Sequence, residues 1–182
     1  MAGGWVMFWR TVGLLSVVVW LSGCASTRTG ADYAAVAQKV GPPRSGQSRI
    51  VILEEKASGA LNLSYTICEV QLDGGPIGRL KPGTYIYADR PAGRHQLLAT
   101  EAFFPGDSKQ ELKTEPGRTY FLLARTSARH DAVTGMSVMG GIAGAVVGSV
   151  ATAGSENAGP VDFVPLDEAA ARTVMAELQL AE

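Results

Sequence analysis

The sequence predicts a mainly β fold: an antiparallel β-sandwich with a C-terminal α-helix, an N-terminal signal helix and a glycine-rich insertion compatible with a helix. Short strand-like runs fill residues 49–125, and turn signals rich in Gly, Pro and Asp separate most of them. These turns recur about every 9 to 14 residues, the spacing of antiparallel sandwiches and barrels. Apolar residues before Cys24 and an Ala-, Glu- and Leu-rich stretch after Asp167 indicate a helix near each end of the chain.

Residues 1–23 are predicted to be a lipoprotein signal peptide. An apolar run at residues 11–20, too short to span a bilayer comfortably, leads into a bacterial lipobox. The motif consists of Leu21, Ser22, Gly23 and Cys24. Small residues let the signal peptidase reach the bond before Cys24, whose thiol would carry a covalent lipid, the only cofactor that the sequence predicts. An uncleaved signal anchor and a secretory signal with a chance cysteine are the alternatives, because Arg10 is the only positive charge before the apolar run.

Charge and cysteine content narrow the function classes. The chain has 182 residues, with 16 Lys and Arg against 17 Asp and Glu. Removal of the signal peptide takes away only Arg10, which leaves 15 basic and 17 acidic residues and a net charge of −2. This balance favours neither nucleic acid nor an anionic lipid surface as a partner. If Cys24 is lipidated, Cys68 is the one remaining thiol, so the mature chain cannot form an intramolecular disulfide.

Residues 24–47 are predicted to be a lipidated tether, since they are rich in Ser, Thr, Gly, Ala and Pro. A short stretch at residues 33–40 could form a helix, which Pro42 and Pro43 would end. The β-sandwich domain is predicted over residues 48–182. Its strands are expected at residues 49–54, 66–72, 76–80, 84–89, 94–103, 109–113, 119–125 and 161–166.

Alternation orients the second of these strands, because its apolar residues point to one face. Val70 and Leu72 share that face with Cys68, which we therefore expect to be a buried structural thiol rather than a reactive one. A helix is predicted over residues 167–180, since acidic residues at its start favour a helix N-terminus. The side chains expected to pack on a sheet are Ala171, Val174, Met175 and Leu178.

Residues 132–155 contain no charged residue and form a predicted glycine-zipper insertion. Gly140, Gly144 and Gly148 recur every four residues, so on a helix they would cover one face and allow close helix packing in a membrane. Three interpretations stay open: a membrane-inserted or self-associating helix, a flexible apolar insertion in a β-hairpin, and a helix packed on the β domain. Each Gly lowers helix stability by about 1 kcal/mol relative to Ala, which favours the second interpretation.

The sequence contains no recognisable catalytic or metal-binding constellation. Its two histidines, His95 and His130, have no metal-ligand spacing to each other or to a cysteine. We interpret His95, at a strand start, as structural, and do not expect His130 to form a site with the adjacent Asp131. Neither a nucleophile elbow nor a phosphate-binding loop is present. The sequence therefore predicts that the protein is not an enzyme and binds no metal.

Several short motifs occur in a fixed order along the strand-rich part of the chain. They are residues 70–74 (VQLDG), 77–80 (IGRL), 82–85 (PGTY), 91–95 (PAGRH) and 116–121 (PGRTYF). Together they resemble an uncharacterised bacterial lipoprotein family of the domain-of-unknown-function 2846 class, over about residues 48–126. The resemblance implies a β-sandwich similar to PEGA-type surface modules, without an assigned reaction. In such lipoproteins Ala25 after the cysteine implies sorting to the outer membrane.

Two functions of different classes follow from these observations. The first is a lipid-anchored periplasmic lipoprotein, a non-enzymatic binding or structural module on the periplasmic face of the outer membrane that contacts an envelope protein or peptidoglycan. The second is a lipoprotein whose glycine zipper self-associates into a homo-oligomer or acts on the membrane. Neither function involves nucleic acid. An envelope hydrolase is a third and weaker hypothesis.

Overall fold

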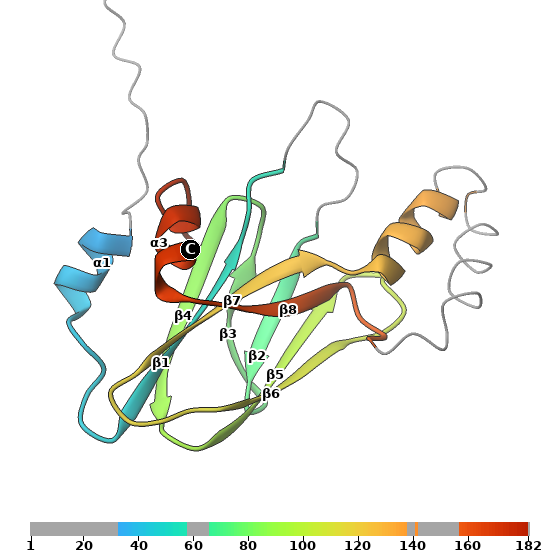
Figure 1. Ribbon diagram of the computed structural model, residues 1–182. Coiled ribbons are helices and arrows are strands. Elements are labelled where there is room, and N and C mark those ends of the chain that lie inside the picture. Colours follow the sequence, from blue (N-terminus) through green and yellow to red (C-terminus); the bar gives the residue numbers. More distant parts are fainter. Residues whose placement is uncertain (1–32, 58–65, 138–140, 142–156, 182) are drawn as a thin grey trace, which may run out of the picture.

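The computed structural model of the chain describes residues 33–57, 66–137, 141 and 157–181 (Figure 1). In chain order the elements are α1 (Tyr33–Val40), β1 (Gln47–Glu54), β2 (Cys68–Leu72), β3 (Gly75–Leu80), β4 (Thr84–Pro91), β5 (Arg94–Glu101), β6 (Ser108–Lys113), β7 (Thr119–Thr126), β8 (Val161–Leu166), α3 (Glu168–Met175) and β9 (Gln179–Leu180). A further helical stretch, residues 128–137, follows β7. The eight strands expected from the sequence are all present, and their ends are shifted by at most two residues.

The strands form two sheets packed face to face. The five-stranded sheet has the order β8-β7-β1-β4-β9, and the four-stranded sheet has the order β3-β2-β5-β6. The four-stranded sheet is antiparallel throughout, whereas the five-stranded sheet contains two parallel pairs, β1 with β7 and β4 with β9. Parallel neighbours need a long crossover, which residues 55–118 supply between β1 and β7. The predicted mainly β sandwich is confirmed, with one of its two sheets mixed rather than purely antiparallel.

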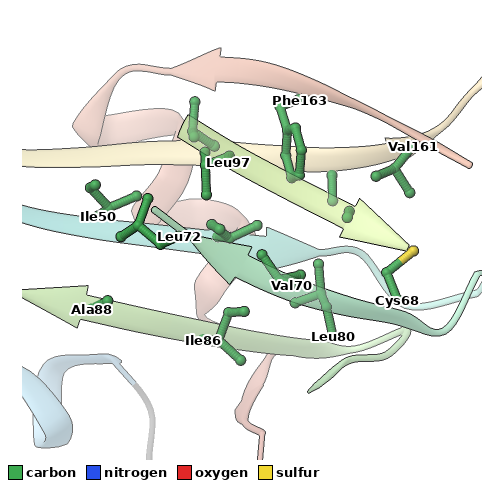
Figure 2. Packing of buried hydrophobic residues seen from close by; sticks show 14 residues of the cluster. Ile50, Cys68, Val70, Leu72, Leu80, Ile86, Ala88, Leu97, Val161 and Phe163 are labelled. Carbon is green, nitrogen blue, oxygen red and sulfur yellow. The ribbon is translucent and has the colours of Figure 1, made fainter. Parts of the chain in front are cut away.

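β1 is the central strand of the five-stranded sheet and is buried on both faces. Ile50 (Figure 2) and Ile52 belong to the core between the sheets, while Val51 and Leu53 belong to the cluster on the opposite face. The rest of the inter-sheet core consists of Cys68, Val70, Leu72, Leu80, Ile86, Ala88, Leu97, Ala99, Leu122, Ala124, Val161 and Phe163. Burial on both faces explains why β1 is apolar at four consecutive positions instead of alternating.

α1 and α3 cover the outer face of the five-stranded sheet and form a third layer (Figure 1). Val36 of α1 is buried in the apolar cluster on that face. The Tyr33 ring packs edge-on against Tyr85 and Phe121, at centroid distances of 6.4 and 5.7 Å. Residues 33–40 of the predicted tether are therefore part of the folded domain, and the helix that the sequence allowed there is present.

The C-terminal helix is shorter than predicted. The sequence predicts a helix over residues 167–180, but α3 ends at Met175 and the chain then forms β9. Asp167 is the helix N-cap. After the helix, Gln179 N donates to Gly83 O at 3.0 Å, so pairing with the free edge of β4 replaces the last predicted helical turn. Of the side chains expected to pack on the sheet, the buried ones are Ala171, Met175 and Leu178.

Several predicted residues lie outside the described part of the chain. They are the lipobox residues Leu21, Ser22, Gly23 and Cys24 and the zipper glycines Gly140, Gly144 and Gly148. Of the insertion predicted at residues 132–155, residues 132–137 are helical and Val133 is buried, so the insertion begins as a helix packed on the domain. Within the residues that the structure describes, no helix is long and apolar enough to cross a membrane.

Candidate functional site

A groove of about 690 Å³ lies where α1, the start of α3 and the start of β7 meet. It forms because β8 is shorter than β7. The register pairs Phe121 with Leu166, the last residue of β8, so that Thr119 and Tyr120 extend beyond the end of the edge strand. The lining includes Tyr33, Ala37, Arg49, Tyr120, Phe121 and Leu166.

Arg49 lines the groove and contacts the loop that follows α1. Its Nε and one terminal nitrogen donate to the two carboxylate oxygens of Asp89 at 2.7 and 2.8 Å, and the other terminal nitrogen donates to Gly41 O at 2.8 Å. Hydrogen bonding to the Asp89 carboxylate raises the pKa of the Arg49 guanidinium, although burial opposes the shift. The guanidinium also lies 5.2 Å from the centre of the Tyr87 ring. Arg49 is thus held in one geometry and fixes the position of α1 on the sheet.

The rim of the groove carries ion pairs that are open to solvent. Arg118 donates to Glu115 at 2.9 Å, and Arg172 donates to Glu168 at 2.6 Å. Arg172 also lies 5.9 Å from the centre of the Tyr33 ring. Exposed pairs contribute little to stability, so these side chains can exchange partners at low cost. The groove therefore combines aromatic surface with charged groups of both signs.

A second cluster closes one end of the core between the sheets. Glu54 lies at the end of β1, is 7% exposed and accepts a hydrogen bond from Thr66 Oγ1 at 3.4 Å. Its second oxygen, Oε2, is buried and has no hydrogen-bond partner among the described residues. Burial raises the pKa of the Glu54 carboxyl from 4.5 to about 7, and the nearby charge of Glu101 adds to the shift.

His130, in the helical residues 128–137, contacts this cluster at Glu101. Its Nε2 lies 3.0 Å from Glu101 Oε2, and its ring stacks on Phe104 at 5.3 Å between centroids. The short contact with Glu101 is not aligned as a hydrogen bond, and His130 Nδ1 is also buried without a hydrogen-bond partner in the described structure. A buried cluster with unpaired polar atoms and a perturbed carboxyl is a candidate functional site.

Cys68 borders the same cluster and its thiol is held in the protonated form. The thiol is fully buried, and burial raises its pKa to about 12, with smaller contributions from Glu101 and Glu54. A thiol reacts through its thiolate, which is scarce at neutral pH under these conditions. The predicted burial of Cys68 is confirmed.

His95 is structural, as predicted, and links the two sheets. Its Nδ1 lies 2.7 Å from Asp73 Oδ2, in the turn between β2 and β3, and its Nε2 lies 2.9 Å from Pro91 O, at the end of β4. Asp73 and Gly74 both have positive φ, as in a type I′ hairpin turn. Both ring nitrogens of His95 therefore face acceptors within the domain.

Sequence reasoning missed the two carboxylates, although alternation could have located them. Glu54 continues the inward-facing series of Ile50 and Ile52, and Glu101 continues that of Leu97 and Ala99. An acid at the end of such a series points into the end of the core. By contrast, the burial of His130 depends on helical residues 128–137 folding back on the sandwich, which the local sequence does not indicate.

These features define a three-layer β-sandwich domain with a lined groove and a buried polar cluster. Residues 44–137, just over half of the chain, match the family described as a protein of unknown function, DUF2846, and the protein belongs to this family. Among curated proteins, none matches the chain. α1, β8 and α3 lie outside the matched residues, so the groove walls that they supply are outside the family match. Within the described part of the chain, no three or more His, Cys, Asp and Glu side chains are placed to hold a metal.

Proposed function

We propose that this protein is a lipid-anchored periplasmic lipoprotein of the outer membrane whose groove binds an extended polypeptide segment of another envelope protein. The groove is the observation that carries the proposal. Aromatic surface from Tyr33, Tyr120 and Phe121 can take apolar side chains, and the exposed pairs of Arg118 and Arg172 can exchange for charges on the ligand. A polypeptide presents both kinds of group at short intervals.

The position of the groove relative to the anchor supports this proposal. Tyr33, in the groove wall, comes nine positions after Cys24. Even a fully extended chain of that length spans only about 30 Å. A lipid on Cys24 would therefore keep the groove close to the membrane surface, where other envelope proteins are concentrated.

A binding role rather than catalysis is proposed because two side chains of types common in catalysis, Cys68 and His95, have structural roles in the domain. The Cys68 thiol is buried and holds its proton, and both ring nitrogens of His95 face acceptors within the domain. Nucleophilic catalysis needs an activated, accessible group next to a base. The two residues instead support the core and the sheet junction.

The anchor is tested by palmitate labelling of cells that express the full chain. Cys24→Ala should abolish labelling, whereas Cys68→Ala should leave it unchanged. Equal labelling of the wild type and Cys24→Ala would contradict a lipid on Cys24. Membrane fractionation tests the sorting: wild-type protein should sediment with the outer membrane, and Ala25→Asp should shift it to the inner membrane.

The groove is tested by photocrosslinking in intact cells. A photoreactive residue at Ala37, in the groove, should give discrete protein adducts, whereas the same residue at Glu69, on the exposed face of the four-stranded sheet, should not. Charge reversal at Arg118 should weaken the adducts from Ala37. Adducts with peptidoglycan alone, adducts of equal strength at both positions or no reproducible adduct would contradict a polypeptide ligand.

A second proposed function rests on the uncharged residues 132–155. Gly140, Gly144 and Gly148 could let two copies associate through one helix face. Crosslinked oligomers in cell envelopes should then disappear in Gly144→Leu and persist in Gly135→Ala, a glycine outside the four-residue series. Unchanged oligomers in Gly144→Leu, or none in the wild type, would remove this proposal.

A further inference from the structure

Two carboxyl groups point into one end of the core from opposite sheets. Glu54 comes from β1 of the five-stranded sheet and Glu101 from β5 of the four-stranded sheet. Glu101 lies directly opposite Cys68 in the register of β5 with β2. The two acids and the thiol thus meet where the apolar core of Figure 2 ends, near the labelled Cys68.

We propose that Glu54 is a proton-binding site whose occupancy decides whether the helical residues 128–137 stay closed over this end of the sandwich. Protonated Glu54 is a neutral group that fits the closed core. Ionised Glu54 carries a buried charge, and its Oε2 has no donor among the described residues. A buried charge without a partner is costly, and water can reach it only if the end of the core opens.

The groups around Glu54 offset only part of the cost of burying its charge in the closed form. Thr66 favours the ionised carboxyl through its backbone and through a 3.4 Å hydrogen bond from its hydroxyl to Oε1, but burial outweighs both, and Cys68, on β2, keeps its proton. Glu101, on β5, is itself an acid. The helix contributes His130, which faces Glu101, and Arg129, whose terminal nitrogen donates to Pro105 O at 3.0 Å.

Among the described residues, the helix is the more weakly bonded wall of the cluster and is therefore the part expected to move. The His130 contact with Glu101 is close but poorly aligned, and His130 Nδ1 has no hydrogen-bond partner in the described structure. The other wall, at Thr66, is fully buried and bonded to Glu54. Opening at the helix would admit water while leaving the sheet pairing intact.

The pH dependence follows from linkage between proton binding and opening. The pKa of Glu54 is about 7 in the closed form, and we take the ordinary value of 4.5 for the open form. The open form therefore binds its proton more weakly, so opening becomes easier as pH rises from 4.5 to 7. Over that interval the opening constant should rise about tenfold per pH unit, or about 300-fold in all, and should level off above it.

Hydrogen exchange of the full-length lipidated protein, measured by mass spectrometry from pH 5 to 8, tests the proposal. After correction for the intrinsic exchange rate, amides of residues 128–137 should lose protection as pH rises, while those of β4 should not. Glu54→Gln should remove the pH dependence, and Glu101→Gln should move its midpoint to lower pH. Glu55→Gln, which alters an exposed neighbour, should behave as the wild type.

Two results would overturn the proposal. One is a protection of residues 128–137 that stays constant over this pH range in the wild type. The other is a pH dependence that persists unchanged in Glu54→Gln, since the responsible group would then lie elsewhere. Neither result bears on the lipid anchor or on crosslinking at the groove.

Discussion

The hydroxyl of Ser108 clamps the backbone of Val161 through both of its polar groups. Ser108 Oγ donates to Val161 O at 2.6 Å and accepts from Val161 N at 2.9 Å. Ser108 begins β6, the edge of the four-stranded sheet, and Val161 begins β8, the edge of the five-stranded sheet. The pair therefore fastens the two sheets along one open side of the sandwich and occupies backbone groups that an edge strand would otherwise expose.

Ser108→Ala should destabilise the domain by about 1 to 3 kcal/mol, because it leaves the buried N–H of Val161 without its acceptor. Urea unfolding at pH 7 measures the effect. Ser45→Ala is the matched control, since Ser45 lies exposed in a turn and should change the free energy of unfolding little. Equal stability of the two variants would show that the clamp contributes nothing.

Gly159 lies against the same clamp and leaves no room for a side chain. An added Cβ would overlap the backbone nitrogen and hydroxyl of Ser108. Gly159→Ala should therefore cost about 3 kcal/mol, as expected for overpacking against backbone that cannot yield. Gly135→Ala should instead stabilise the domain by about 0.5 to 1 kcal/mol, because Gly135 is helical and its Cβ would meet open space. Thermal unfolding of both variants should give shifts of opposite sign.

Arg49→Lys should cost about 1 to 3 kcal/mol although it conserves the charge. One ammonium group cannot reproduce the paired bonds to Asp89 together with the bond to Gly41 O. Arg79→Lys is the control, since Arg79 pairs with Glu69 at the exposed surface and should change stability by no more than about 0.5 kcal/mol. Similar losses of unfolding free energy in both variants would mean that burial does not strengthen the ion pair of Arg49 with Asp89.

Strand positions could be predicted from the sequence because they depend on local signals. Turns such as the one at Asp73 and Gly74 require positive φ and have a recognisable composition. The end of α3 could not be predicted from the sequence, because the residues after Met175 retain a helical composition. Their conformation is decided by the unpaired edge of β4 and by Gly83 just before it, whose carbonyl oxygen accepts the hydrogen bond from Gln179 N. Tertiary pairing overrides helix propensity there.

The candidate sites were less predictable than the fold. The groove depends on where β8 ends relative to β7, a register that joins residues more than 40 positions apart. Similarly, the polar cluster links Glu54 to His130 only through Glu101, which requires both sheets and the helical residues 128–137 to be in place. Alternation identifies Glu54 and Glu101 as inward-facing, but only packing shows that they share one end of the core.

The acid response of the domain should depend on Asp73, whose pKa shift is opposite in sign to that of Glu54. Burial acts to raise the pKa of Asp73, but hydrogen bonds from the Gln96 backbone and from His95 outweigh it and hold the pKa below its ordinary value of 3.8. A lowered pKa stabilises the folded state above the ordinary value, and this contribution is lost as pH falls through the folded value.

Asp73→Asn should therefore be less stable than the wild type at pH 6, and the difference should shrink between pH 4 and pH 2.5 as the wild-type carboxylate becomes protonated. Urea midpoints across this range measure it, with Asp107→Asn, an exposed turn residue, as control. Because the Asp73 side chain is 41% exposed, solvent screening keeps the effect smaller than that of a buried pair. A difference that stays constant with pH would indicate that the charge of Asp73 is irrelevant and that only its turn geometry stabilises the hairpin.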